Sequence, residues 1–369
     1  MKKIVEKRWK KIQLHLEDKK AEAFIVSNPY NIQYLSNPEI RHTPATKYPI
    51  RFLIIPRAEE PIAISPYMEA NRVRDKFPIS QVLTFSGVSA PDIETDATKA
   101  EELVKKVLTE RKLESILFDQ QMTNLGIKGE VDKFVESMRA IKDQHEIECI
   151  KNAQSITIRA AEKMKDILEE GKSEIQIANE LEYTIRKLGA PFVYFDSIIA
   201  SGENSAYGHH QPSERKIRRG DVVVCDFGAF YRGYGADVTR TYFIGRVSKD
   251  VTEVYQAVYE SVQAGIDCVE EGIPYQKIDK VCNDALKKYG LQRFRWVSGT
   301  GHGIGIEVHE RPRVGPDSNE VVKEGHVFTI EPGVYIPGKF GVRIEDDILV
   351  YKGVHNLTLI EKSMEEIIL

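Results

Sequence analysis

The sequence predicts an α/β chain of two domains, an N-terminal α/β domain over residues 1–141 and an α+β domain over residues 142–369. Three observations support this prediction. The 369 residues exceed the size of one typical domain. The first part alternates short apolar runs with helical patterns. The second part contains an internal repeat of two helices followed by two strands.

Composition and charge exclude several classes of protein. A hydrophobic content of 41% and a charged content of 29% are typical of a globular protein with a large core. The net charge of −4 gives no basic excess, so we expect no nucleic-acid partner. No apolar run approaches the ~18 residues of a membrane span, so we expect no membrane partner. Residues 1–16 have the spacing of an amphipathic helix, not of a signal peptide, and no CxxC pair is present. We therefore expect a cytoplasmic protein.

The first domain alternates predicted strands with predicted helices. Five short runs rich in β-branched and aromatic residues predict strands at 23–27, 52–56, 61–65, 81–85 and 115–119. Residues 97–111 and 124–138 have apolar positions at helical spacing and predict two helices. The glycine-rich fingerprint of a nucleotide site is missing, so this domain gives no sign of a nucleotide ligand.

The second domain begins with a change of pattern near Lys142. From Ile147 to Ile167, apolar and small residues recur at steps of three and four, which predicts one long amphipathic helix. Gly171, a residue typical of helix ends, closes it.

From this helix onward the chain repeats one order of elements: two helices, a Ser-Gly segment with histidines, and a two-strand ribbon. The first half has helices ending at Gly171 and Gly189, then SGENSAYGHH, then RRGDVVVCDFGAFYRGYGADVTRTYF. The second half has helices at 250–270 and ending at Gly290, then SGTGHGIGIEVH, then KEGHVFTIEPGVYIPGKFGVRIEDDILV. Two such halves predict a pseudo-two-fold pair with the ribbons meeting in the middle.

Each ribbon carries two acids that flank its turn, and the first acid of each directly follows an apolar run, VVVC or VFTI. They are Asp226 and Asp237 in the first ribbon, and Glu331 and Glu345 in the second. An acid that ends a buried apolar strand is costly unless it is paired or bound to a metal. Facing positions in a hairpin bring side chains within ~5 Å, and four ionised carboxylates stay together only with cations. The simplest remedy is a pair of divalent ions bridged by carboxylates.

The glycine-rich stretch WVSGTGHGIGIEVHERP, residues 296–312, offers a histidine ligand, His302. Its alternating glycines allow close backbone approach and unusual dihedral angles, which we interpret as room beside metals. Neither phosphate-loop register is present, and Arg313 stands where the second histidine of an HExxH motif would follow His309. A lone histidine is more often a satisfied polar residue than a ligand, but the four acids favour a ligand here.

Several motifs together resemble the pita-bread metallopeptidases, above all their Xaa-Pro dipeptidase (prolidase) group. They are DFGA at 226–229, ADVTRTYF at 236–243, GTGHGIGIEVHE at 299–310, TIEPGVY at 329–335 and GVRIEDD at 341–347. NPYNIQYLS at 28–36 is similar to a segment of the creatinase/prolidase-type N-terminal domain found in that group. The resemblance covers the whole chain and implies an N-terminal α/β domain followed by a pita-bread catalytic domain.

The resemblance implies five metal ligands, all of the residue type expected in the family. They are Asp226, Asp237, His302, Glu331 and Glu345, with Asp237 and Glu345 bridging two divalent ions. Four carboxylates and one imidazole suit Mn²⁺, and Co²⁺, Fe²⁺ and Zn²⁺ also fit. Glu331 is then the residue that accepts the proton of a metal-bridging water, whose hydroxide attacks the carbonyl.

The resemblance also implies residues that contact substrate. His209, in the family's His-x-x-Pro motif, and His309 are expected to contact the substrate and the tetrahedral intermediate, whereas His210 is the less favoured neighbour. Arg313 and Arg343 stand where the family places arginines near substrate. For Arg343 a structural pairing with an acid is an equal alternative, and Arg313 has the alternative of a surface arginine.

The activity implied is hydrolysis of the Xaa-Pro bond in dipeptides by a homodimer. Three alternatives remain open: an Xaa-Pro aminopeptidase acting on longer peptides, a catalytically inactive peptide-binding relative, and a hydrolase of another small amide. Because the family's N-terminal domain reaches toward the partner's site, the segment RHTPATKYPIRF at 41–52 is a candidate for that contact. An ordinary surface loop is the other interpretation of this segment.

Overall fold

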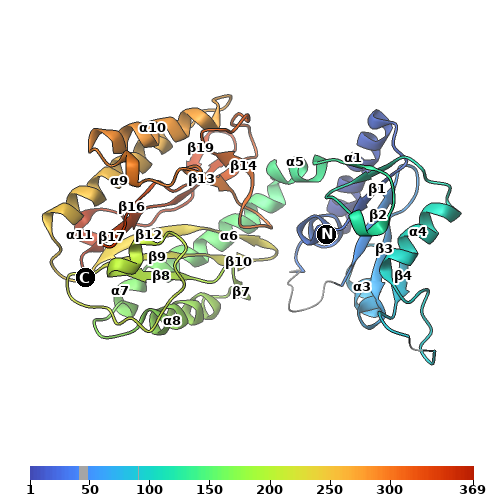
Figure 1. Ribbon diagram of the computed structural model, residues 1–369, viewed down its shortest axis with the longest axis horizontal. Helices are drawn as coiled ribbons and strands as arrows, with labels where there is room; N and C mark the ends of the chain where they lie inside the picture. Colours follow the sequence, from blue (N-terminus) through green and yellow to red (C-terminus); the bar gives the residue numbers. More distant parts are fainter. Residues whose placement is uncertain (41–48, 90) are drawn as a thin grey trace. The chain divides into compact units, whose positions relative to one another are not determined.

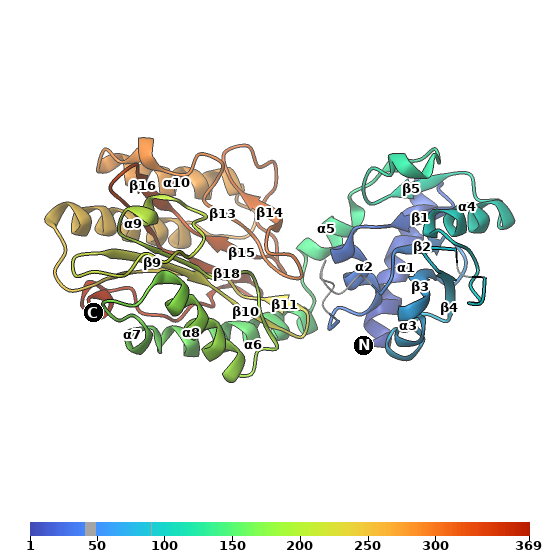
Figure 2. The same ribbon diagram turned by 60° about the horizontal axis from the view of Figure 1, so that its bottom comes forward.

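The computed structural model describes residues 1–40, 49–89 and 91–369, and Figures 1 and 2 show its elements from two sides. The chain forms two compact units, Met1–Arg139 and Ala140–Leu369. No described helix is long and apolar enough to cross a membrane. Each unit is a mixed α/β structure, as the sequence predicts.

The first unit is built on a six-stranded sheet with the order β4-β3-β2-β1-β5-β6. The strands are β1 (Ala23–Val26), β2 (Phe52–Pro56), β3 (Ile62–Pro66), β4 (Gln81–Phe85), β5 (Ile116–Phe118) and β6 (Glu130–Val131). The helices are α1 (Lys2–Lys19), α2 (Pro29–Ser36), α3 (Ala70–Lys76), α4 (Ala100–Glu110) and α5 (Phe134–Ala140). All five predicted strands and the helix predicted at 97–111 are therefore confirmed.

The helix predicted at residues 124–138 is wrong. The chain instead makes a short 3-10 turn, the edge strand β6, and only then helix α5. Gly126 has a φ of +61°, which ends the turn, and a Cβ on Gly129 would lie 2.2 Å from the ring of Phe118. The two glycines therefore fit a close edge strand beside β5, which the apolar spacing alone did not reveal.

The second unit confirms the repeat of two helices and a ribbon. In the first half these elements are α6 (Gln144–Ala161), α7 (Met164–Ile167), α8 (Glu174–Lys187), β9 (Val222–Phe227) and β12 (Val238–Phe243). In the second half they are α9 (Lys249–Asp267), α10 (Tyr275–Lys288), β15 (Val327–Ile330) and β18 (Asp346–Val350). Further strands are β7 (Phe192–Val193), β8 (Ile198–Ser201), β10 (Ala229–Tyr231), β11 (Tyr234–Gly235), β13 (Gly301–Gly303), β14 (Glu310–Val314), β16 (Gly333–Ile336), β17 (Phe340–Arg343) and β19 (Val354–Asn356), and helix α11 (Met364–Ile367) follows.

The single long helix predicted before Gly171 is broken in two. Helix α6 ends at Ala161 and α7 begins at Met164. At the break the pattern of backbone hydrogen bonds changes. The N–H of Glu162 donates to the carbonyl of Ile158, four residues earlier, whereas the N–H of Lys163 donates to that of Ala160, three residues earlier. Apolar spacing continues through both helices, so the sequence pattern gives no sign of this interruption.

Strand alternation separates the core from the acids. In β9, Val223, Cys225 and Phe227 belong to the apolar core formed with the helices, as do Phe328 and Ile330 in β15. Because successive side chains point to opposite faces of a strand, Asp226 and Glu331 lie on the other face of each ribbon. The helices therefore cover one side of the ribbons, and the acids gather on the opposite side.

The register of the first ribbon differs from the facing pair expected. Asp226 of β9 is opposite Thr239 of β12, so Asp237, two residues before Thr239, is its diagonal neighbour on the same face. In the second ribbon, Ile330 pairs with Asp346, and Gly333 with Arg343. Extending either register places Glu331 opposite Glu345, which agrees with the expected facing positions.

Candidate metal centre

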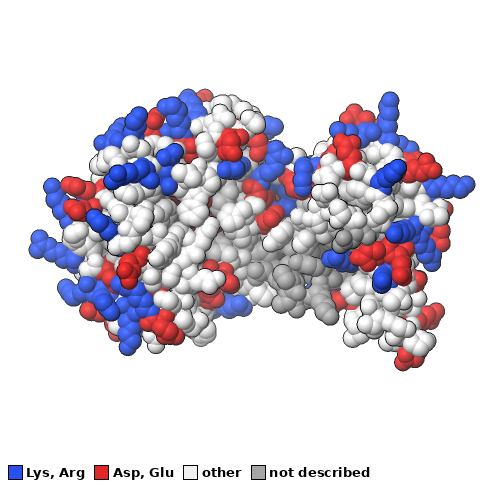
Figure 3. All heavy atoms as spheres, in the orientation of Figure 1, with Lys and Arg blue, Asp and Glu red and all other residues white. Residues whose placement is uncertain are grey.

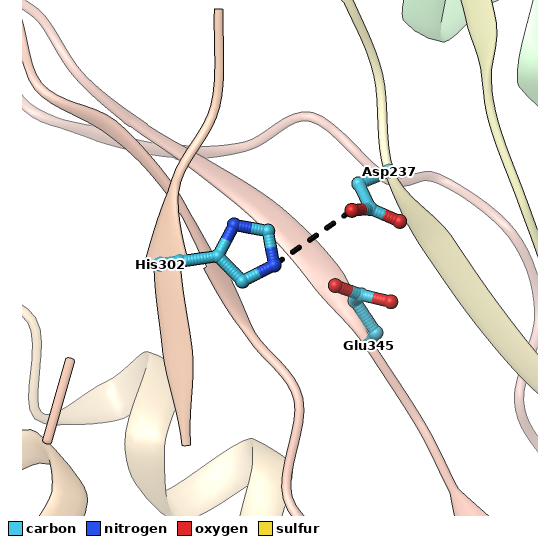
Figure 4. Close-up of side chains that lie close together, drawn as sticks. All are labelled: Asp237, His302 and Glu345. Atoms are coloured by element: carbon cyan, nitrogen blue, oxygen red, sulfur yellow. Dashed lines mark ion pairs between the residues drawn. The ribbon is translucent and has the colours of Figure 1, made fainter. Parts of the chain in front are cut away.

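Acids from both ribbons converge with His302 on the inner face of the second unit. Ligand atoms of Asp237, His302 and Glu345 all lie within 4.8 Å of one another, and Figure 4 shows the three side chains pointing toward a common point from three strands or strand ends. His302 Nε2 lies 3.8 Å from Asp237 Oδ2 and 3.2 Å from Glu331 Oε1. Asp226 adjoins the group through its contact with Asp237.

The carboxylates are short of hydrogen-bond partners. Asp226 Oδ1, Asp237 Oδ1 and Glu345 Oε1 are buried and have no partner within the described residues. Burial, followed by the charges of neighbouring acids, raises the pKa of Asp237 and of Glu345 well above the usual range. A buried oxygen without a donor is rare and calls for an explanation. Carboxylate oxygens and one imidazole together form a set of ligands that a divalent cation such as Mn²⁺ can bind.

His302 is held so that one ring nitrogen faces the acids. Its backbone N–H donates to Thr329 Oγ1 at 3.1 Å, and its Nδ1 lies 3.2 Å from the carbonyl of Gly303. Donation by Nδ1–H leaves Nε2 unprotonated toward the carboxylates when the ring is neutral, the arrangement expected of a metal-ligating histidine. His302 belongs to strand β13.

The glycines on either side of His302 allow close approach of neighbouring strands. A Cβ on Gly301 would lie 2.0 Å from the carbonyl oxygen of Thr329, and one on Gly303 would lie 2.3 Å from that of Arg311. They admit neighbouring strands, whereas we had expected room beside metals. Among the glycines of residues 296–312, only Gly299 has a positive φ, of +153°.

Two further histidines flank the centre. The ring of His309 lies 4.2 Å from that of His302, and loss of water around it, followed by the charge of His302, lowers its pKa to about 4. His209 is exposed, and its ring lies 4.8 Å from the ring of Trp296. The structure therefore brings His309 beside the metal-binding residues and sets His209 against an aromatic wall.

Comparison with known proteins decides the family. Residues 148–352 match metallopeptidase family M24, and residues 8–147 match the creatinase/prolidase N-terminal domain. The chain belongs to metallopeptidase family M24. It is 37% identical to the Xaa-Pro dipeptidase of Pyrococcus furiosus over 66% of this chain and 70% of that protein.

Solved structures of similar proteins have the same fold. A structure of Xaa-Pro dipeptidase from Bacillus anthracis matches with a TM-score of 0.86 and 29% identity, and covers 99% of this chain and 100% of its own. An X-Pro aminopeptidase from Thermotoga maritima matches with a TM-score of 0.84 and 30% identity, and covers 98% and 99%. The pita-bread fold expected from the resemblance is therefore confirmed.

Arg343 lies beneath the acids of this M24 site. Its Nη2 donates to Asp226 Oδ2 at 2.5 Å, its Nε donates to Thr239 Oγ1 at 3.0 Å, and its Nη1 contacts Tyr335 Oη at 2.7 Å. The guanidinium is almost fully buried. The structure therefore has the pairing with an acid that the sequence left as an alternative to substrate contact.

Arg313 is placed differently. It is the direct strand partner of His302 across β13 and β14. Its guanidinium donates to the Ser298 carbonyl and lies 3.4 Å from Asp317, and half of the side chain is exposed. It therefore has no contact with the metal-binding acids in the described structure and remains accessible at the edge of the site.

Two residues that support the centre were missed from the sequence. Thr239 Oγ1 donates to Glu345 Oε2 at 2.7 Å, and Asp347 Oδ2 accepts from the backbone N–H of Asp237 at 3.1 Å. Each stands two positions after a ligand on the same strand face, so period-two spacing from Asp237 and Glu345 was the available signal.

The segment that carries His209 is tied to one buried acid, Glu174, at the start of α8. Its carboxylate accepts hydrogen bonds from both N–H and hydroxyl of Ser201 (2.7 and 2.7 Å) and of Ser213 (3.0 and 2.6 Å). It also accepts from Asn204 at 3.1 Å and lies 2.8 Å from His210 Nε2. Burial alone would raise the pKa of Glu174, but these hydrogen bonds outweigh it and hold the pKa below its ordinary value.

Proposed function

We propose that this M24 protein hydrolyses the peptide bond that precedes proline in Xaa-Pro dipeptides, through a centre in residues 142–369 that holds two divalent ions. Asp226, Asp237, His302, Glu331 and Glu345 would hold the ions. The observation that carries this proposal is the convergence of these side chains, with three buried carboxylate oxygens that lack a donor within the described residues. The dipeptidases named among its relatives support the choice of substrate.

The chemistry of the bond explains the need for metals. The nitrogen of an Xaa-Pro amide carries no hydrogen, so an enzyme cannot recognise this bond through an N–H donor. Two bound ions would polarise the scissile carbonyl and lower the pKa of the attacking water. We propose Mn²⁺ or Co²⁺, and Fe²⁺ or Zn²⁺ also fit the ligand set.

The roles of the side chains follow from their positions. Glu331, whose carboxylate lies 3.2 Å from His302 Nε2, would accept the proton of the water and pass it to the proline nitrogen. His309, neutral at pH 7 because its pKa is about 4, can donate a hydrogen bond to the substrate backbone or the tetrahedral intermediate, and His209 would do the same.

Arg313 and Arg343 would have different roles. Arg313, half exposed at the rim, would hold the proline carboxylate through paired hydrogen bonds. Arg343, buried against Asp226 at 2.5 Å, would instead fix the orientation of that ligand. This assignment leaves the substrate-binding role of Arg343 as the less supported of the two alternatives.

The proposal is tested by loading the purified protein with Mn²⁺ or Co²⁺ and measuring proline release from Ala-Pro and Met-Pro. Release that stops on chelation and returns with metal would support it. No release under any of the four ions would contradict it. Bound metal without release would support the inactive peptide-binding alternative.

A second candidate is an Xaa-Pro aminopeptidase, because the Thermotoga maritima structure of that name covers 98% of this chain at 30% identity. Comparing kcat/KM for Ala-Pro with that for Ala-Pro-Ala-Ala separates the two. A dipeptidase cleaves the first much faster, and an aminopeptidase cleaves the second at least as fast.

We also propose a cytoplasmic homodimer. The resemblance to the family supports this assembly, and light scattering of the eluting protein tests it. Residues 41–48 of the candidate contact segment lie outside the described residues. A monomeric mass at micromolar concentration would contradict the assembly without affecting the proposed chemistry.

A further inference from the structure

A pocket with a volume of about 600 Å³ opens beside the candidate metal centre in the second unit. Its lining combines apolar side chains, two arginines and one glycine. The lining residues are Ala206, Gly208, Arg293, Phe294, Arg295, Trp296, Val297, Tyr335 and Pro337. No role was assigned to Arg293, Arg295 or Trp296 from the sequence.

Hydrogen bonds connect the pocket wall to the metal-binding acids. Nη1 of Arg343 contacts both the carbonyl of Gly208 at 3.1 Å and the hydroxyl of Tyr335 at 2.7 Å. Nη2 of the same guanidinium donates to Asp226 at 2.5 Å. The buried side chain of Arg343 therefore contacts two residues of the pocket lining and one metal-binding acid. The pocket is thus adjacent to the candidate metal centre.

Trp296 shapes the pocket and links it to His209. Its ring lies 4.8 Å from His209 and 5.7 Å from Tyr335. It packs directly on Gly208, where an added Cβ would lie 1.9 Å from the indole ring. A substrate chain that contacts His209 therefore reaches this aromatic wall with its next group.

The charge of the pocket is positive. Arg293 lies over the ring of Phe294 at 4.6 Å, and Arg295 donates to the carbonyl of Gln292 at 2.6 Å. Among the described residues no carboxylate lies within ion-pair distance of either guanidinium, and the lining contains no Asp or Glu. Burial raises the pKa of Asp279, a residue outside the lining, and the charge of Arg295 acts to lower it. On the face shown in Figure 3, acidic and basic side chains are interspersed.

We propose that this pocket receives the Xaa side chain of the substrate and favours acidic side chains, so that Glu-Pro and Asp-Pro are preferred over their amides. The proposal rests on the proposed function, since it names the substrate class of the same site. The apolar wall accommodates the methylene groups, and the two guanidinium groups attract the carboxylate.

The test compares kcat/KM for Glu-Pro, Gln-Pro and Ala-Pro in the metal-loaded protein and its variants. We expect Glu-Pro to exceed Gln-Pro by roughly three- to tenfold at low ionic strength, a ratio that falls as salt is added. Arg293→Gln combined with Arg295→Gln should bring the ratio close to one. Arg186→Gln is the matched control, because Arg186 is also stacked beside a phenylalanine, Phe192 at 5.8 Å, but does not line the pocket.

Two results would overturn the proposal while the proposed function stands. One is a Glu-Pro to Gln-Pro ratio that the double variant leaves unchanged. The other is an equal loss for all three dipeptides, which would place the arginines on the proline carboxylate that every substrate shares.

If no Xaa-Pro dipeptide is cleaved, the proposed function fails. Binding of the same dipeptides then tests whether the pocket selects acidic side chains. Tryptophan fluorescence reports on it, because Trp296 lines the pocket whereas Trp9 is buried in the first unit. A change with Glu-Pro that is weaker with Gln-Pro and absent in Trp296→Phe would support an acid-selective pocket. Equal or absent changes would overturn it.

Discussion

The two halves of the second unit hold their histidine-bearing segments in different ways. In the first half, residues 201–213 carry His209 and are tied to the buried carboxylate of Glu174. In the second half, residues 299–303 carry His302 on strand β13, which is held by backbone pairing with β14 and β15. The first tie consists of side-chain hydrogen bonds to one acid, and the second is a sheet ladder.

The difference is visible at equivalent helix positions. Ser173 precedes Glu174 at the start of α8, and Pro274 precedes Tyr275 at the start of α10. Where the first half has a buried acid that accepts several hydrogen bonds, the second has a tyrosine whose hydroxyl contacts His326 at 2.7 Å. The repeat therefore conserves the placement of elements, while each half stabilises its own functional segment. We expect the backbone pairing of β13 to hold the metal-binding His302 rigidly. We expect the hydrogen bonds of Glu174 to position His209 for contact with the substrate.

The largest expected effect comes from the ligands, and here the two halves should behave alike. Asp237→Asn in the first ribbon and Glu331→Gln in the second should each lower kcat/KM on the order of 10²–10⁴-fold. Metal analysis of both variants separates ligand loss from loss of the proton acceptor. A variant of either ribbon with full activity and full metal content would remove that residue from the centre.

Metal removal should destabilise both ribbons, because the metals offset repulsion between their acids. Binding at about 100 times Kd stabilises a fold by about 2.7 kcal/mol, so chelation should lower Tm. In the metal-free fold, burial raises the pKa of Asp237 above its ordinary 3.8 and that of Glu345 above 4.5.

The raised pKa values give this effect a pH dependence with a definite sign. At these two acids the metal-free folded state binds more protons than the unfolded state above about pH 4, so their contribution to its stability falls as pH rises. Bound metals favour the ionised acids and oppose that fall. Calorimetry from pH 5 to pH 8 should therefore show a widening gap in Tm between loaded and chelated protein. A gap that narrows would contradict this account.

Glu174→Gln removes hydrogen bonds from the segment of His209 and leaves the backbone pairing of β13 intact. Because a buried amide cannot accept all of these donors, we expect a loss of roughly 1–3 kcal/mol in unfolding free energy. We also expect a lower kcat/KM with unchanged metal content. In a His209→Asn background the same change should add little further kinetic loss, since both act through His209. A full additional loss would show that Glu174 acts elsewhere.

Tyr275→Phe is the matched control in the second half. It removes the contact with His326 and should cost about 1 kcal/mol of stability. Because β13 is held by its own ladder, kcat/KM should be unchanged. Kinetic loss equal to that of Glu174→Gln would erase the distinction between the halves.

Arg313→Gln should have a smaller kinetic effect than the variants of the metal-binding residues. The side chain is half exposed, so losing its hold on the proline carboxylate should raise KM about tenfold or less, with kcat nearly unchanged. Arg311→Gln, on the same strand β14, is the control. A fall in kcat with KM unchanged would place Arg313 in the chemical step instead.

The sequence predicted the repeat and the four acids because both leave local signals. An acid directly after VVVC or VFTI stands out, and Gly220 and Gly325 precede Asp226 and Glu331 at the same spacing. The diagonal position of Asp237 was not predictable, because register depends on turn geometry that residue types alone do not give.

The residues that support the site were harder to predict. Glu174 reads as an ordinary charged residue in the first turn of a helix, and only contacts about 27 to 39 positions away reveal its burial. The pocket likewise joins Ala206 and Gly208 with residues 293–297 and with Tyr335 and Pro337. Long-range contacts of this kind leave no periodic pattern along the chain.

The central claim is that two ribbons of one M24 chain jointly hold two divalent ions. A crystal structure of the Mn²⁺-loaded protein, with anomalous scattering to locate the ions, tests it most directly. The account predicts two ions roughly 3.5–4 Å apart, bound by Asp226, Asp237, His302, Glu331 and Glu345. Ions bound by residues of one ribbon alone, or no ions between the ribbons, would contradict it.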